Sequence, residues 1–154
     1  MSQSTPIAHS RDNTVRFFTT YVETNSNELA GKTVVDLSAG SGYIAHLFEK
    51  AGAVVCPFDL FPDQNQFTKV KSKSIDLQKK FPIESQSADL VICAETIEHL
   101  PNQLFLFQET ARILKPNGQK PILYLLKKEW IPSGLHTIVH YTEELCLWMH
   151  TLTL

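Results

Sequence analysis

Two aspartates and two glycines lie where side chains and backbone could together hold a small ligand. Asp36 lies near the end of the apolar, β-branched run at residues 33–37, and the small-residue loop at residues 38–42 follows that run at once. Gly40 and Gly42 let a backbone approach a ligand without a Cβ in the way, and a helix beginning after them offers its N-terminus. Asp59 ends the next apolar run. The alternative for the loop is a tight structural turn.

Asp36 is the residue that distinguishes between nucleotide ligands. Gly40, Gly42 and Ala45 satisfy the loose fingerprint of dinucleotide-binding loops, so the loop alone does not choose one. A pyrophosphate at this helix would meet the Asp36 carboxylate at close range, a repulsion of several kcal/mol. S-adenosylmethionine (SAM) has no phosphate and carries an ammonium and a sulfonium. The acid therefore favours SAM, and an NAD-dependent dehydrogenase is the disfavoured alternative.

Asp59 and Asp76 extend the pattern to the next two strands. A carboxylate at Asp59 could accept hydrogen bonds from both ribose hydroxyls, although a turn aspartate is the alternative. Asp76 ends the third expected strand, where it could meet the amino group of an adenine. Asp76 alone is uninformative, but together with Asp36 and Asp59 it gives a series of acids at successive strand ends.

Glu95, Glu98 and His99 form an ExxEH pattern after the fourth apolar run. Residue 95 and residue 98 or 99 would share one face of a helical turn. They offer a base for a hydroxyl nucleophile, or oxygen and imidazole ligands suited to magnesium, manganese or iron. The structural alternative is that Glu98 and His99 cap and orient the helix starting near Pro101. We take Glu98 and His99 as candidate catalytic residues and assign no metal ligand.

Apolar periodicity predicts the elements that position these residues. Predicted helices span residues 13–30, 43–50, 61–70 and 102–114, with a final one from residue 142. Predicted strands span residues 33–37, 53–60, 74–77, 88–94 and 122–126. This alternation predicts an α/β fold, a parallel sheet with helices on both faces.

Composition indicates one domain over residues 1–154, with 43% hydrophobic and 19% charged residues. We divide it into a polar lead-in (1–12), the N-terminal helix (13–30), a core (31–126) and a shortened C-terminal part (127–154). A net charge of −2 gives no reason to expect a nucleic-acid partner. The three cysteines are scattered, and neither a secretory signal nor a membrane span is expected, so a cytoplasmic location is predicted.

Four ordered segments resemble the class I SAM-dependent methyltransferases, in particular the methyltransferase type 11 and type 12 domains. The segments are VVDLSAGSGYIA, FDL, SIDLQKKFPIESQSADLVICAETIEHLPN and ARILKPNGQ, with a looser echo at HYTEEL. The resemblance implies a Rossmann-like, doubly wound, mostly parallel sheet in the order 3-2-1-4-5, and SAM as cofactor. Its cofactor-binding residues would be Asp36, Ser38, Ala39, Gly40 and Gly42 for the methionine part, Asp59 and Leu60 at the ribose, Asp76 and Leu77 at the adenine, and Glu95 on the methyl side.

Two departures from the family pattern affect these expectations. Ser38 replaces the usual first loop glycine, so cofactor binding is expected to be weaker or unchanged. The usual C-terminal hairpin of strands 6 and 7 is expected to be missing, because the sequence stops at Leu154. The fifth strand would then be an uncovered edge, which proteins normally avoid. Truncation, a homodimer through that edge, or loss of activity would each account for it.

The resemblance implies methyl transfer, an in-line displacement that depends on positioning nucleophile, carbon and sulfur. ExxEH with a later histidine, His136 or His140, resembles the metal site of small-RNA 2′-O-methyltransferases. EHLP resembles the ubiquinone-pathway O-methyltransferases. The segment after the fourth strand lacks an Asn/Asp-Pro-Pro-Tyr motif, which argues against methylation of an exocyclic base nitrogen. We expect methylation of a small molecule, at oxygen, without membrane or nucleic-acid partners. A non-catalytic or truncated SAM-binding module is the alternative.

Overall fold

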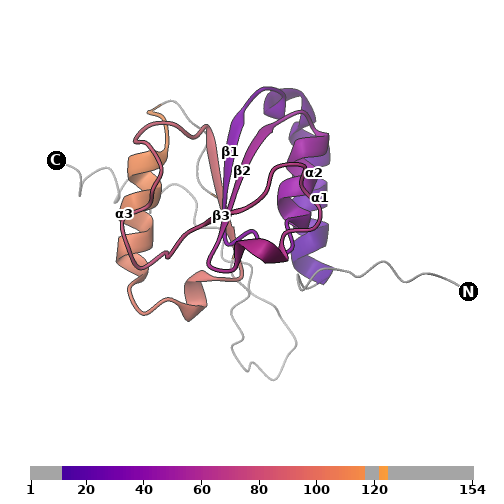
Figure 1. Cartoon of the computed structure of the whole chain (residues 1–154). Helices are drawn as coiled ribbons and strands as arrows, with labels where there is room; N and C mark the ends of the chain where they lie inside the picture. The colour runs from indigo at the N-terminus through magenta and orange to yellow at the C-terminus, as the bar shows by residue number, and fades with distance from the viewer. Residues whose placement is uncertain (1–11, 117–121, 125–154) are drawn as a thin grey trace, which may run out of the picture.

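A five-stranded parallel sheet forms the centre of the protein in the computed structural model, which describes residues 12–116 and 122–124 (Figure 1). Its strands are β1 (Thr33–Leu37), β2 (Val54–Asp59), β3 (Lys73–Ser74), β4 (Leu90–Ala94) and β5 (Ile122–Tyr124). They lie in the order β3-β2-β1-β4-β5, and every pairing is parallel. The predicted order and direction of the strands are confirmed.

Helices cover both faces of the sheet, as predicted. Helices α1 (Asp12–Leu29) and α2 (Tyr43–Lys50) lie on one face, and α3 (Gln103–Ile113) lies on the other (Figure 1). Side chains alternate along each parallel strand, so the central strands supply both cores. Val34 packs with α1 and α2, and Val35 packs with α3.

Local signals explain where these helices begin and end. Gly42 precedes α2 with a φ of 84°, a left-handed value that glycine adopts at little cost. Asn102 caps α3, because its side-chain oxygen accepts a hydrogen bond from the Phe105 backbone N–H at 3.1 Å. The predicted cap by Glu98 and His99 is wrong, because Asn102 supplies it.

The predicted helix at residues 61–70 is wrong, since only a short 3₁₀ turn, η1 (Pro62–Gln64), forms there. The backbone N–H groups of Gln66 and Phe67 donate to the Ser41 carbonyl oxygen, at 2.8 and 3.3 Å. An N–H that donates to a distant carbonyl cannot also close a helical turn, so these long-range bonds prevent the helix.

The third strand is shorter than the predicted 74–77 and ends before Asp76. The Asp76 carboxylate accepts a hydrogen bond from the Gln78 N–H at 3.0 Å, and the Asp76 carbonyl accepts one from the Lys79 N–H at 3.0 Å. These bonds form a turn of the kind that aspartate favours. Asp76 therefore lies in the turn after β3 and does not end the strand.

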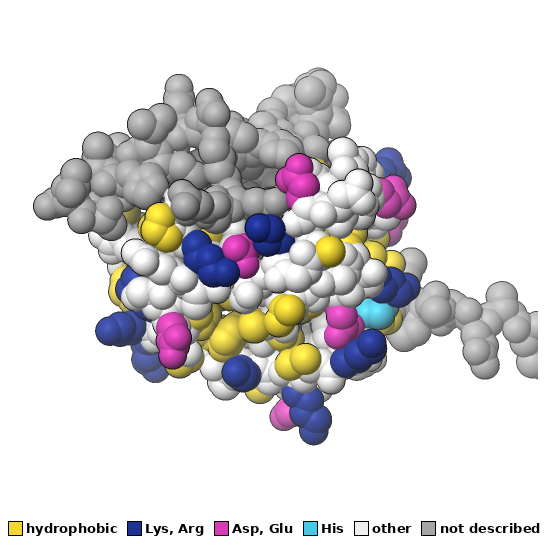
Figure 2. All heavy atoms as spheres, turned by 90° about the horizontal axis from the view of Figure 1, so that it is seen from above, with side chains coloured by type: hydrophobic (Ala, Val, Ile, Leu, Met, Phe, Trp, Pro, Cys, Tyr) yellow, Lys and Arg dark blue, Asp and Glu magenta, His cyan; other side chains and the backbone are white. Residues whose placement is uncertain are grey.

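Some expectations fall outside the described residues: the final helix from residue 142, the missing hairpin, and both His136 and His140. No helix within residues 12–116 is both long and apolar enough to cross a membrane. On the face at the amino ends of the strands, Lys and Arg side chains are interspersed with Asp and Glu (Figure 2).

Candidate functional site

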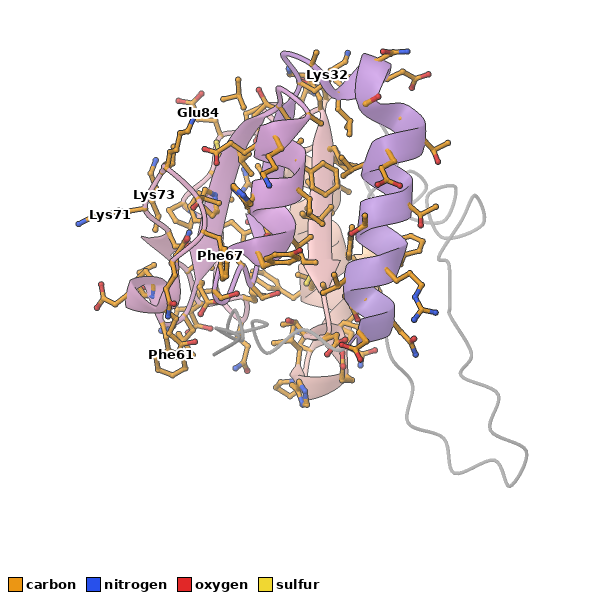
Figure 3. All side chains as sticks on the ribbon, turned by 90° about the vertical axis from the view of Figure 1, so that its right-hand side faces the viewer. Lys32, Phe61, Phe67, Lys71, Lys73 and Glu84 are labelled. Carbon is orange, nitrogen blue, oxygen red and sulfur yellow. The ribbon has the colours of Figure 1, made fainter. Side chains whose placement is uncertain are left out.

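The candidate site lies at the carboxyl edge of the sheet. Figure 3 locates this edge, because Lys32 precedes β1 at one end of the molecule and Phe61 follows β2 at the other. The short turns η1 and η2 (Ile97–His99) both lie at the carboxyl edge (Figure 1). Ligands of open α/β sheets bind at this edge, where the chain passes from strand to helix.

The loop at residues 38–42 is held by backbone hydrogen bonds to the end of β2. The N–H groups of Ser38 and Ala39 both donate to the Phe58 carbonyl oxygen at 2.8 Å, and the Gly42 N–H donates to the Ala39 oxygen at 2.7 Å. Ser38 and Gly40 have φ values of 82° and 51°. Apart from Gly40 itself and its two chain neighbours, no heavy atom of the described residues lies within 4 Å of the position that a Cβ would take at Gly40.

Asp59 joins the loop to the end of β2 through both carboxylate oxygens. Its Oδ2 accepts a hydrogen bond from the Gly40 N–H at 2.8 Å, and its Oδ1 accepts one from the Phe61 N–H at 2.8 Å. A carboxylate has about four acceptor positions, so capacity remains for a ligand hydroxyl. The Asp59 side chain is thus fixed in orientation before any ligand binds.

Asp36 is a buried acid with one carboxyl oxygen that lacks a partner among the described residues. It is 2% exposed, and its Oδ2 has no hydrogen-bond partner within the described part of the chain. Burial, and secondly the negative charge of Asp59, raise the pKa of Asp36 to about 8. The free protein therefore favours the neutral acid at pH 7, and not the carboxylate that was expected from the sequence. A nearby cation would favour the charged form.

The loop after β4 contacts both the glycine loop and α1. Glu95 has a φ of 51°, an uncommon value for a residue with a side chain, and such outliers cluster at functional sites. The Thr14 hydroxyl in the first turn of α1 donates to the Glu95 carboxylate. The hydroxyls of Ser38 and Thr96 lie 2.6 Å apart. Neither Thr14 nor Thr96 carried a sequence signal, because each partner is remote in the chain.

Glu98 and His99 are both exposed on η2, at the same edge as Asp36 and Asp59. Residues 12–116 contain no group of three or more His, Cys, Asp or Glu side chains that could hold a metal ion. Glu95, Glu98 and His99 therefore do not converge into such a group.

The residues expected around the adenine and ribose differ in exposure. Leu77 is 8% exposed and belongs to the core beneath α3, so its side chain does not line the edge. Leu60 is 57% exposed, and Phe61, which the sequence analysis did not select, is 61% exposed. Hydrogen bonds from the Gln78 N–H and from Lys79 lower the pKa of Asp76 and fix its carboxylate in the turn.

A parallel sheet in this order, with a glycine loop and two acids at its carboxyl edge, places the protein in the class of Rossmann-like, doubly wound α/β folds. The family model described as a methyltransferase domain matches residues 8–144. The chain belongs to this family of methyltransferase domains.

Both curated relatives and solved structures are similar to this chain. The ubiquinone biosynthesis O-methyltransferase of Histophilus somni is 29% identical over 111 residues, which are 64% of this chain and 47% of that protein. The chain thus spans about half the length of this curated relative. A protein from Pyrococcus horikoshii superposes with a TM-score of 0.62 at 27% identity, covering 77% and 60% of the two chains. An S-adenosylmethionine-dependent methyltransferase from Mesorhizobium loti has a TM-score of 0.57 at 23% identity, covering 64% and 48%.

Proposed function

We propose that this chain is a SAM-dependent methyltransferase domain that methylates a small molecule at oxygen. The observation that carries the proposal is the buried Oδ2 of Asp36 beside the glycine loop, which has no partner within residues 12–116 and 122–124. Such an oxygen is costly unless a ligand satisfies it, and a cation satisfies it best. SAM offers an ammonium, which would stabilise the charged form of Asp36, whereas a pyrophosphate would offer no such charge compensation.

The remaining contacts of SAM follow from the geometry at the same edge. Asp59, already held by the N–H groups of Gly40 and Phe61, would accept hydrogen bonds from the ribose hydroxyls. The open space beside Gly40 would admit the methionine part. The exposed side chains of Leu60 and Phe61 provide apolar surface for the adenine. Asp76 and the backbone of Leu77 are proposed neighbours of its amino group.

Bound SAM supplies a methyl group on a sulfonium. In the proposed reaction an acceptor oxygen bonds to the methyl carbon, the carbon–sulfur bond breaks, and the acceptor hydroxyl loses its proton. Glu98 or His99 is proposed to take that proton, since both are exposed at this edge. Glu95 is proposed to line the methyl side, and its strained backbone is consistent with a functional role.

The choice of oxygen rests on relatives named for ubiquinone biosynthesis O-methylation. A small hydroxylated molecule is accordingly the proposed acceptor. A cytoplasmic location and a homodimer through the sheet edge stay predictions, as does a single domain over residues 1–154.

Calorimetric titration with SAM, and with its demethylated product, tests the proposal. We expect micromolar binding that is lost in Asp59→Ala. Asp89→Ala is the matched control, because Asp89 also accepts a backbone hydrogen bond, from the Thr33 N–H at 2.9 Å, but at the amino end of the sheet. No binding by the folded wild-type chain would refute the proposal. Binding without transfer to any hydroxylated acceptor would favour the non-catalytic module.

A further inference from the structure

The connection between β2 and β3 packs directly on the glycine loop and on α2. The N–H groups of Gln66 and Phe67 both donate to the Ser41 carbonyl oxygen, as described above. The Phe67 ring meets the Tyr43 ring edge-on, with centroids 5.2 Å apart. Figure 3 shows Phe67 lying against α2. The loop at residues 38–42 is therefore held by the β2–β3 connection as well as by the end of β2.

Within this connection, Asn65 is the residue whose side chain lies nearest to Gly42. A Cβ built at Gly42 would lie 2.3 Å from Asn65 Oδ1 and 2.8 Å from Asn65 Cγ. These distances mean that the Asn65 amide occupies the space that any other residue at position 42 would need. Gly42 also has a φ of 84°. Glycine is therefore favoured at this position for two reasons, the left-handed backbone and the lack of room for a side chain.

The Asn65 side chain is itself held in place from several directions. Its Nδ2 donates to the hydroxyl oxygens of Thr68 at 2.7 Å and Ser72 at 2.8 Å. Its Oδ1 accepts from the Thr68 N–H at 3.3 Å. A side chain fixed in this way acts as a rigid wedge, whereas a mobile one would yield to the loop.

We propose that Asn65 is a positioning residue that holds the Gly42 turn in the shape that binds the cofactor. The loop is then fixed on two sides, by Asp59 at Gly40 and by Asn65 at Gly42. Gly42 immediately precedes α2, so its placement also sets the position of that helix N-terminus against the ligand. This inference rests on the proposed function, because it deepens the account of the same site.

Titration with SAM compares the wild type with Asn65→Ala and Asn65→Asp. Loss of the wedge should raise the Kd for SAM about tenfold in Asn65→Ala, because small misplacements of a binding loop are costly. Asn65→Asp keeps the shape but loses both Nδ2 donor bonds, so a smaller rise is expected. Asn25→Ala is the matched control, since Asn25 donates to the Tyr21 carbonyl within α1 at 2.7 Å. A purely structural role would lower the unfolding temperature and leave the Kd unchanged.

A double-mutant cycle with Gly42→Ala isolates the contact. Gly42→Ala should weaken SAM binding more in the wild type than in Asn65→Ala, where the clash is relieved and only the backbone strain is left. The proposal would be overturned if Gly42→Ala raised the Kd for SAM by the same factor in the wild type and in Asn65→Ala.

Amide hydrogen exchange gives a readout that does not depend on the cofactor. The Gly42 N–H donates to the Ala39 oxygen, and the His46 N–H donates to the Gly42 oxygen at 2.9 Å. Both amides should exchange faster in Asn65→Ala than in Asn25→Ala. Unchanged exchange would overturn the positioning role. Faster exchange in a chain whose wild type does not bind SAM would refute the proposed function alone.

Discussion

The Thr14 hydroxyl donates a hydrogen bond to the Glu95 carboxylate, joining α1 to the loop after β4 across 81 positions of sequence. Thr14 is fully buried, and Glu95 is half-buried with a left-handed backbone. The first turn of α1 is thereby attached to the carboxyl edge of the sheet, where the candidate site lies.

Thr14→Val tests this attachment, because valine keeps the shape and removes the hydroxyl. We expect the free energy of unfolding to fall by about 1.5–3 kcal/mol, the usual contribution of a hydrogen bond to a charged group. Chemical denaturation measures it. Thr14→Ser should restore most of the loss, and Thr20→Val, at an exposed position on the same helix, should have little effect. Equal losses for Val and Ser at position 14 would contradict the hydrogen bond.

Ser38 has a left-handed backbone, and its hydroxyl forms a hydrogen bond with the Thr96 hydroxyl. Two substitutions separate the effect of the backbone strain from that of the hydrogen bond. Its φ is 82°, and its hydroxyl lies 2.6 Å from that of Thr96. Ser38→Gly and Ser38→Ala both remove the hydroxyl, but only glycine relieves the left-handed strain. We expect Ser38→Gly to be more stable than Ser38→Ala by about 1 kcal/mol in thermal unfolding. Equal stability of the two variants would mean that the strain is absent.

Arg112 and Glu109 form an ion pair on α3 that holds the segment before β4. Arg112 Nη2 lies 2.7 Å from Glu109 Oε2, which also accepts from the Phe81 N–H at 2.7 Å. Arg112 further donates to the carbonyl oxygens of Phe81 and Ile83, at 3.2 and 2.9 Å. Glu109 is 8% exposed, so removal of its partner would leave a buried charge without compensation.

We expect Arg112→Met to lower the free energy of unfolding by about 2–3 kcal/mol, and Glu109→Gln to recover part of that loss in the double variant. Arg112 lowers the pKa of Glu109, so the stabilisation is present above pH 4.5 and is lost as the pH falls below the lowered value. Lys79→Met is the control, since Lys79 pairs with Asp76 at the same spacing on the surface. Additive effects in the double-mutant cycle would show that the pair is not coupled.

The sheet and the placement of two acids were predictable from local signals. Runs such as residues 33–37 and 88–94 are apolar enough to be central strands, and glycines mark the turn that follows the first one. Since the carboxyl ends of parallel strands meet at one edge, Asp36 and Asp59 had to lie near each other. The parallel pairing of β1 with β2 confirms this, because it places Asp36 opposite Pro57, two residues before Asp59.

The rest of the site depends on contacts that no local pattern encodes. The local pattern of residues 61–70 is helix-like, but their N–H groups bond to the Ser41 carbonyl instead of closing a helical turn. Ser41 lies in a different loop, so the pattern of residues 61–70 gives no sign of this competition. Strand β3 ends early because the Asp76 side chain forms its own turn. The pairing of Thr14 with Glu95 becomes visible only after α1 has packed on the sheet.

The raised pKa of Asp36 predicts that the free energy of unfolding decreases as the pH rises. Its pKa is about 8 in the folded protein and 3.8 in an ordinary environment, so the folded state holds the proton over a range in which the unfolded state has lost it. Its contribution is therefore intact below about pH 4 and decreases until about pH 8. Since each pH unit between the two pKa values is worth about 1.4 kcal/mol, the total is on the order of a few kcal/mol.

Asp36→Asn should remove this pH dependence, so that the variant exceeds the wild type in stability at pH 8.5 but not at pH 4. Urea denaturation at several pH values measures the difference. Asp89→Asn is the contrasting control, because a hydrogen bond from Lys115 lowers the pKa of Asp89 and that variant should lose stability above pH 4. SAM should flatten the wild-type dependence, since a cation beside Asp36 favours its carboxylate. A wild-type slope that Asp36→Asn leaves unchanged would mean that Asp36 is already charged in the free protein.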